Sequence, residues 1–212
     1  MAQQNPIDII YQGAIQGKTQ EQRENIAYMF NKPLVAGGCF SSAQYMTDEE
    51  YFRRINTKKQ SLGLYGRAVE QIGLDPEELQ EIPPVCLENF VFNDAWTKTT
   101  QSGMRVSSSY QVSWIFFSAE QIYLYQYTMY MDEDKKREDT EEYFYQDVTA
   151  FVTKSQSEKA KNTDGTTVEV ETTKLGIVVP GTTLMVAVND SDSTFRNAVK
   201  AMKFKLREKK NG

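Results

Sequence analysis

The chain has 212 residues, a length that suits one domain with an added segment and that can bury a substantial hydrophobic core. It contains no histidine and only two cysteines. These counts exclude histidine-ligated metal sites, Ser-His-Asp and Cys-His nucleophile pairs, and zinc sites built from three or four thiolates. We therefore predict no catalytic residue, no metal ligand and no cofactor-binding residue, and we interpret the chain as a non-enzyme.

The net charge is −5, and it is unevenly distributed along the chain. Residues 193–212 carry seven Lys/Arg and one Glu, a net of +6, which leaves −11 for all the other residues. An acidic chain argues against a dedicated nucleic-acid binder, because such proteins usually carry excess positive charge. The basic end is either a docking tail or a helix end that complements the helix dipole.

No apolar stretch approaches the length of a membrane span, and Met1–Asn5 has neither the basic nor the apolar region of a signal peptide. Cys39 and Cys86 lie far apart and form no CxxC pair. We expect both to be buried structural thiols in a soluble cytoplasmic protein, with a redox pair as the alternative.

Residues 1–82 are expected to form a helical segment. Thr19–Gln22 has the pattern of a capping box and predicts the start of a helix. Pro33 is expected to stop this helix. Gly13–Thr19 has three residues between its glycines, whereas a phosphate-binding P-loop needs four. We therefore interpret it as a connection between helices.

A second capping pattern, at Thr47–Glu50, predicts the start of a longer helix with apolar residues at helical spacing. Gly73 is expected to end this helix. Gly63 and Gly66 lie inside it, where they indicate a kink or a close contact with another helix. Asp75–Glu78 predicts a short helix that begins with Asp as its N-cap and Pro in its first turn.

Residues 83–212 have a different character, because β-branched and aromatic residues dominate short runs that are separated by turn signals. Strands are expected at Val85–Phe92, Val106–Phe117, Gln121–Met131, Tyr143–Thr153, Thr166–Val179 and Thr183–Val188. The links Ser118–Glu120 and Asn162–Gly165 are short, which predicts antiparallel pairing. Asp132–Asp139 mixes charges of both signs and is interpreted as a solvated hairpin tip, with a charged docking loop as the alternative.

A final helix is expected after Asp190–Ser193, which offers several N-caps. Its apolar residues share one face at 3.6 residues per turn: Phe195, Ala198, Val199, Met202 and Leu206. A basic stripe lies beside that face: Arg196, Lys200, Lys203 and Arg207. Phe204 points away from the apolar face, so it is either an exposed side chain or is covered by the N-terminal helices or by another subunit.

Tyr123, Tyr125 and Tyr127 fall on one face of a predicted strand, because side chains alternate along a strand. We expect this face to pack against the N-terminal helices. A protein-binding surface is the alternative, since tyrosine is favoured at interfaces.

The second half of the chain resembles a known family. Trp114–Phe117 and Gln121–Tyr125 resemble the second and third strands of pleckstrin-homology-like (PH-like) domains, and Glu142–Thr149 resembles a "Y-x-D-[IV]-T" strand of bacterial PH-like and GRAM-like proteins. Phe195–Lys210 resembles their closing helix. The resemblance implies an α+β fold, with a helical segment (1–82) before an antiparallel PH-like barrel or sandwich (83–212) that a C-terminal amphipathic helix closes.

A fold of this kind leaves the function open. We expect a non-catalytic binding or scaffold module that binds an unknown protein partner or assembles with itself. Peripheral binding to an anionic membrane surface through the basic face of the last helix is the alternative. An enzyme built on carboxylates, lysines or tyrosines is a third hypothesis, which would require a pocket with paired, pKa-shifted acids.

Overall fold

The computed structural model describes residues 5–35, 42–74, 83–189 and 193–211. Its helices are α1 (Pro6–Ile15), α2 (Gln20–Met29), α3 (Asp48–Ser61), α4 (Leu64–Ile72) and α5 (Ser193–Asn211). Its strands are β1 (Val85–Val91), β2 (Thr97–Thr99), β3 (Arg105–Ser107), β4 (Ser109–Phe117), β5 (Gln121–Tyr130), β6 (Lys136–Phe144), β7 (Ala150–Lys161), β8 (Thr167–Val179) and β9 (Thr182–Ala187).

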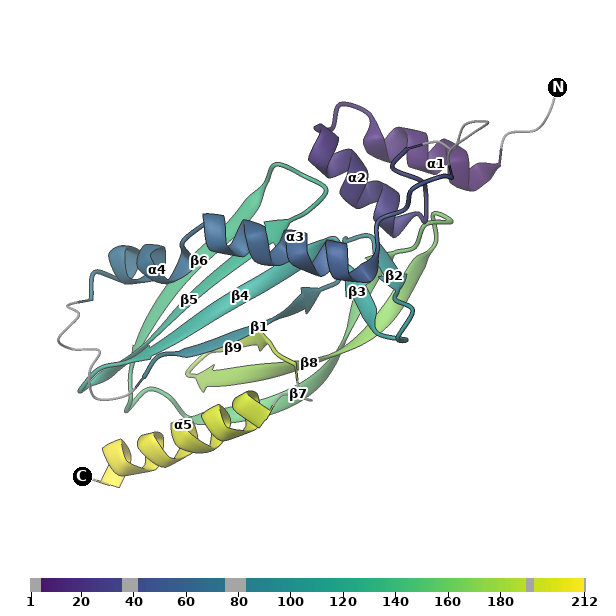
Figure 1. Cartoon of the computed structure of the whole chain (residues 1–212). Helices are drawn as coiled ribbons and strands as arrows, with labels where there is room; N and C mark the ends of the chain where they lie inside the picture. The colour runs from purple at the N-terminus through teal and green to yellow at the C-terminus, as the bar shows by residue number, and fades with distance from the viewer. Residues whose placement is uncertain (1–4, 36–41, 75–82, 190–192, 212) are drawn as a thin grey trace.

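The strands form two main antiparallel sheets (Figure 1). The first has the order β1-β4-β5-β6 and the second has the order β7-β8-β9, while β2 and β3 form a separate hairpin. The α+β class, the antiparallel pairing and the C-terminal helix are therefore as predicted. The closed barrel was wrong, because no strand of one main sheet pairs with a strand of the other among the described residues.

The central strands of the first sheet, β4 and β5, are buried on both faces. Helices α3 and α4 lie over one face, and the second sheet and α5 lie on the other side of the molecule (Figure 1). The helix side holds one core, which includes Tyr51, Leu64 and Phe116, and the sheet–sheet side holds another, which includes Ile115 and Leu175. Alternate side chains of β4 and β5 therefore enter different cores.

The N-terminal helices are joined to the sheets by both apolar and polar contacts. Tyr28 and Tyr51 stack with their ring centroids 4.3 Å apart, and Tyr51 Oη donates a hydrogen bond of 2.8 Å to the carbonyl of Ser107. Asn25 Nδ2 donates to the carbonyl of Met131 at 2.8 Å. The described residues before position 75 and those from position 83 onwards thus differ in secondary structure but share one core.

The caps and stops in the helical segment have clear local causes. Thr19 forms the predicted capping box with Gln22, and Thr47 Oγ1 accepts from the amide of Glu50. The predicted long helix is instead two helices, because Gly63 adopts a left-handed conformation, with φ of 55°, between α3 and α4. Gly73 ends α4 as predicted, at φ of 72°.

Three strand predictions need correction. The expected strand Val106–Phe117 is divided at Ser108 into β3 and β4, and the short β2 was not predicted. The expected strand Tyr143–Thr153 was wrong, because Tyr145–Thr149 is a turn between β6 and β7 whose Tyr145 and Val148 are buried in the second core. This turn is the "Y-x-D-[IV]-T" segment.

The predicted hairpin tip at Asp132–Asp139 was wrong in its second half, which belongs to β6. Strand β6 lies at the edge of the first sheet, and an edge strand tolerates such charges.

The predicted connection at Gly13–Thr19 is correct only in its second half, because Gly13–Ile15 form the end of α1 and only Gln16–Thr19 link α1 to α2. Pro33 lies beyond the end of α2. Some predictions lie outside the described residues. These are the helix at Asp75–Glu78, the environment of Cys39 and the caps at Asp190–Asp192.

Candidate functional site

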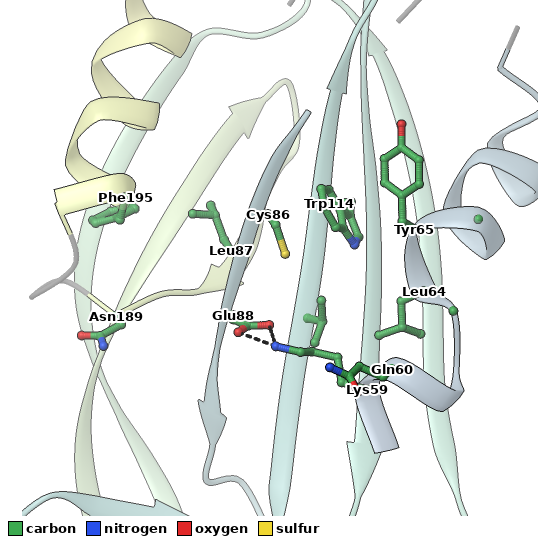
Figure 2. Close-up of a pocket in the computed structure, with 13 residues that line it drawn as sticks. Lys59, Gln60, Leu64, Tyr65, Cys86, Leu87, Glu88, Trp114, Asn189 and Phe195 are labelled. Carbon is green, nitrogen blue, oxygen red and sulfur yellow. Dashed lines mark hydrogen bonds and ion pairs between the residues drawn. The ribbon is translucent and has the colours of Figure 1, made fainter. Parts of the chain in front are cut away.

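A cavity of about 480 Å³ opens beside the N-terminal half of β1, and we call it the β1 cavity (Figure 2). It lies between the α3–α4 turn, strands β1 and β4, and the first turn of α5. Its lining residues are Lys59, Gln60, Gly63, Leu64, Tyr65, Gly66, Cys86, Leu87, Glu88, Val112, Trp114, Asn189 and Phe195. Because Cys86 and Leu87 point to opposite faces of β1, the cavity wraps around the edge of the strand.

Strand β1 is an edge strand, since it pairs with β4 and with no other strand of the first sheet. The amide of Phe90 donates to the Asn89 side chain at 2.8 Å, and the amide of Phe92 donates to the buried Glu158 carboxylate at 2.6 Å. These amides therefore point away from β4. Residues two and four positions earlier on the same strand, Cys86 and Glu88, direct their main-chain groups to the same outer side.

The two halves of this outer edge differ. The C-terminal half is satisfied by side chains, namely those of Asn89 and Glu158, and Asn89 Nδ2 also reaches the carbonyl of Val188 at 2.7 Å. Within the described chain, no other strand or side chain bonds to the outward main-chain groups of Cys86 and Glu88. Those groups lie where the cavity opens.

The helix-side wall of the cavity is aromatic. Trp114 on β4 is partly buried, and Tyr65 on α4 meets it edge to face, with ring centroids 5.1 Å apart and planes at 73°. Tyr65 is 43% exposed, so its ring is held by Trp114 and also faces the opening. The left-handed Gly63 places Leu64 and Tyr65 here, because it turns the chain from α3 into α4.

An ion pair forms the floor of the cavity. Lys59 Nζ lies 2.8 and 2.9 Å from the two carboxylate oxygens of Glu88 (Figure 2). Both side chains are partly exposed, which limits the stability that the pair contributes. Burial, together with the nearby Glu88 carboxylate, raises the pKa of the Tyr110 phenol, so this neighbour stays neutral.

Cys86 is a free, partly buried cysteine in the same wall. Burial, and then the Glu88 carboxylate, raise the pKa of its thiol to about 12. At neutral pH the sulfur is therefore a protonated thiol and contributes apolar surface rather than a thiolate nucleophile.

The opposite edge of the first sheet has a different chemistry. There, β6 begins with the charged run Lys136–Asp139, and Arg137 and Asp139 pair with each other on the strand. Charged side chains on an edge strand oppose pairing with further strands. The first four residues of β1, Val85–Glu88, contain a single charged side chain, which Lys59 neutralises.

The structure divides the predicted interaction residues into two groups. Tyr123, Tyr125 and Tyr127 are buried in the core under the helices, which confirms the predicted packing and removes them from any exposed surface. The basic stripe is exposed on α5 at Arg196, Lys200, Lys203 and Arg207. Phe204 is also exposed, at 71%, and the N-terminal helices do not cover it.

Sequence reasoning missed the β1 cavity. A pattern of alternating residues identifies β1 as a strand but does not show that it is the edge of its sheet. In the described part of the chain, no three His, Cys, Asp or Glu side chains gather closely enough to hold a metal ion. None of the described helices is long and apolar enough to cross a bilayer.

Comparisons with profiles of known protein families, with curated proteins and with solved structures found no match to this chain.

Proposed function

We propose that the protein is a non-catalytic binding module that receives an extended segment of a partner polypeptide along the outer edge of β1. The observation that carries the proposal is the pair of outward-facing main-chain positions at Cys86 and Glu88, which open into the β1 cavity. An incoming strand pairs with such an edge through its own main chain, and this supplies affinity without requiring one particular sequence.

The cavity walls give the added strand its preference in side chains. Alternate residues of a strand beside β1 face opposite sides of the sheet. One set meets Trp114, Leu64 and Tyr65, and the other set meets Leu87 and Phe195. Because both walls are apolar or aromatic, the preferred segment is short, uncharged and apolar on both faces.

We include the PH-like assignment of residues 83–212 in this proposal because the order of elements is consistent with it. Antiparallel strands follow each other without an intervening helix and a single amphipathic helix comes last. A PH-like scaffold is consistent with a binding role, but the β1 edge and not the fold indicates binding here.

A filled-cavity variant tests the site without weakening the protein. Gly66 lies in helix α4 and lines the cavity, and a Cβ atom added there would meet no atom within 4 Å. Gly66→Leu should therefore fold at least as well as the wild type, since leucine is the better helix former. Gly13→Leu, in helix α1 away from the cavity and equally free of contacts, is the matched control.

The probe is a phage-displayed library of random nine-residue peptides selected on the wild-type protein. Selected peptides should bind the wild type and Gly13→Leu and lose binding to Gly66→Leu. N-methylation of the peptide should abolish binding at alternate positions only, because every second amide of an added strand faces β1. Peptides that bind Gly66→Leu equally well, or that tolerate methylation at every position, would contradict the proposal.

A further inference from the structure

The outer face of α5 carries an exposed aromatic residue at its centre. Phe204 is the most exposed large hydrophobic side chain among the described residues, at 71%. It lies opposite the buried face of the helix, where Phe195, Met202 and Leu206 enter the second core. With the opposite face fixed in this way, Phe204 cannot turn inward without removing the whole helix from the sheet.

Basic side chains line one flank of Phe204. At about 100° per residue, Lys200 and Arg207 lie about 40° to 60° to one side of it, and Arg196 and Lys203 continue the stripe. All four are exposed, and within the described chain none of them forms an ion pair or hydrogen bond. On the other flank, Glu208 pairs with Lys205 at 3.6 Å. The outer face is therefore an aromatic centre with four uncompensated positive charges.

The position of α5 leaves this face accessible. The helix lies along the periphery of the molecule, on the side opposite α3, and its C-terminal end points away from the sheets (Figure 1). A flat surface can therefore approach it without meeting another element first.

We propose that the outer face of α5 docks on an anionic membrane surface. Phe204 enters the boundary between headgroups and acyl chains, and the basic stripe contacts the anionic headgroups. An amphipathic helix with an aromatic residue among lysines and arginines binds membranes in this way. The proposal does not depend on the β1 cavity.

A lipid surface accounts for both features of the face better than other occupants do. A second copy whose α5 packed antiparallel on this face, about a two-fold axis beside Phe204, would place the stripe of one chain close to that of the other, and like charges would repel. An acidic protein surface would satisfy the basic residues but would not by itself explain an unpartnered phenyl ring. The interfacial region of an anionic bilayer offers an apolar layer and negative charge at adjacent depths.

Vesicle flotation of the full chain tests the proposal. Vesicles of phosphatidylcholine with about a third phosphatidylserine should bind the protein, whereas phosphatidylcholine alone should bind it weakly, and added salt should release it. Phe204→Ser should lower the apparent partition coefficient about tenfold or more. Lys200→Gln and Arg207→Gln should each lower it about fivefold.

Matched variants control for general effects. Phe144→Ser removes another exposed phenylalanine, on β6, and Arg53→Gln removes an exposed arginine on α3. Neither should change vesicle binding. Phe204→Trp should retain binding, and its fluorescence should shift to the blue on anionic vesicles if the ring enters the bilayer.

Three results would overturn the proposal: no flotation with anionic vesicles at low salt, flotation that Phe204→Ser leaves unchanged, or a fluorescence of Phe204→Trp that vesicles do not shift. Binding of the basic stripe to single-stranded RNA or to a polyglutamate probe with no binding to vesicles would overturn it as well, in favour of a polyanion as the partner.

Discussion

Arg67 on α4 and Glu138 on β6 form a two-pronged ion pair that joins residues 71 positions apart in the sequence. The Arg67 Nη2 atom lies 2.9 and 2.8 Å from the two Glu138 oxygens, and Nε lies 3.1 Å from one of them. Tyr125 Oη donates to the same carboxylate at 2.8 Å, and Lys136 Nζ does so at 2.6 Å. This carboxylate fixes α4 to the sheet and thereby positions Leu64 and Tyr65 in the wall of the β1 cavity.

Glu138→Gln should destabilise the protein by about 1–3 kcal/mol, because Arg67, Lys136 and Tyr125 lose a charged acceptor. Urea unfolding followed by circular dichroism measures the change. Glu142→Gln is the matched control on the same strand, where the side chain is exposed, and it should shift the free energy of unfolding by less than about 0.5 kcal/mol. Equal effects of the two variants would refute the role given to Glu138.

The same carboxylate predicts a loss of stability in acid. Burial opposes ionisation of Glu138, but hydrogen bonds from Lys136, Tyr125 and Arg67 outweigh it and hold the pKa at about 2, against an ordinary value of 4.5. A pKa that is lower in the folded state stabilises the protein above pH 4.5, and this contribution declines as the pH falls from there towards 2. The free energy of unfolding should therefore fall between pH 6 and pH 3, and less steeply in Glu138→Gln. Parallel pH profiles for the two proteins would contradict this assignment.

Asp132→Asn should increase stability at neutral pH. Asp132 is 5% exposed, and its Oδ1 atom has no hydrogen-bond partner among the described residues. Burial, together with repulsion from Glu133, raises the pKa of this carboxyl above its ordinary value and outweighs the hydrogen bonds from its own backbone amide and from the Ser108 side chain. Because the pKa is raised in the folded state, ionisation of Asp132 destabilises the protein as the pH increases. Asp132→Asn, a neutral isostere, should therefore raise the free energy of unfolding by about 1 kcal/mol at pH 7 and by less at pH 3. A lower midpoint of urea unfolding at pH 7 for Asp132→Asn would show that the ionised form is required.

Two glycines close together in sequence should respond in opposite directions to alanine. Gly63 has φ of 55°, and a Cβ atom there would meet no other atom within 4 Å, but an L residue is strained in this conformation. Gly63→Ala should therefore lower the free energy of unfolding by about 1 kcal/mol. Gly66 lies inside α4 in open space, so Gly66→Ala should gain up to about 1 kcal/mol. Thermal unfolding of both variants checks the pair, and a shift in the same direction would disprove the local explanation.

Local signals predicted much of the fold. The capping box at Thr19, the helix stop at Gly73 and the alternation of Tyr123, Tyr125 and Tyr127 depend on neighbouring residues only, and the structure confirms them. The strand β6 was missed because its charged residues are typical of a loop, and their partners, such as Arg67, lie far away in the sequence.

The candidate site could not be predicted for a related reason. The floor of the β1 cavity joins Lys59 to Glu88, and its wall joins Tyr65 to Trp114. Each of these contacts links a helix to a strand across tens of residues. The open edge of β1 depends on the order of strands in the sheet, and no single segment of sequence contains that order.

Burial of β4 on both faces has a consequence for how this strand finds its register with its neighbours. Trp114–Phe117 is apolar at every position, so displacement of β4 by one residue would still bury each of these side chains. The shifted register would therefore expose no apolar surface that could disfavour it. The neighbouring turn distinguishes the two arrangements, because the Ser118 amide donates to the Gln121 carbonyl at 3.0 Å and the Ser118 hydroxyl accepts from the Gln121 amide at 3.0 Å. The turn at Ser118 thus determines which of the two hydrophobic cores each side chain of Trp114–Phe117 enters.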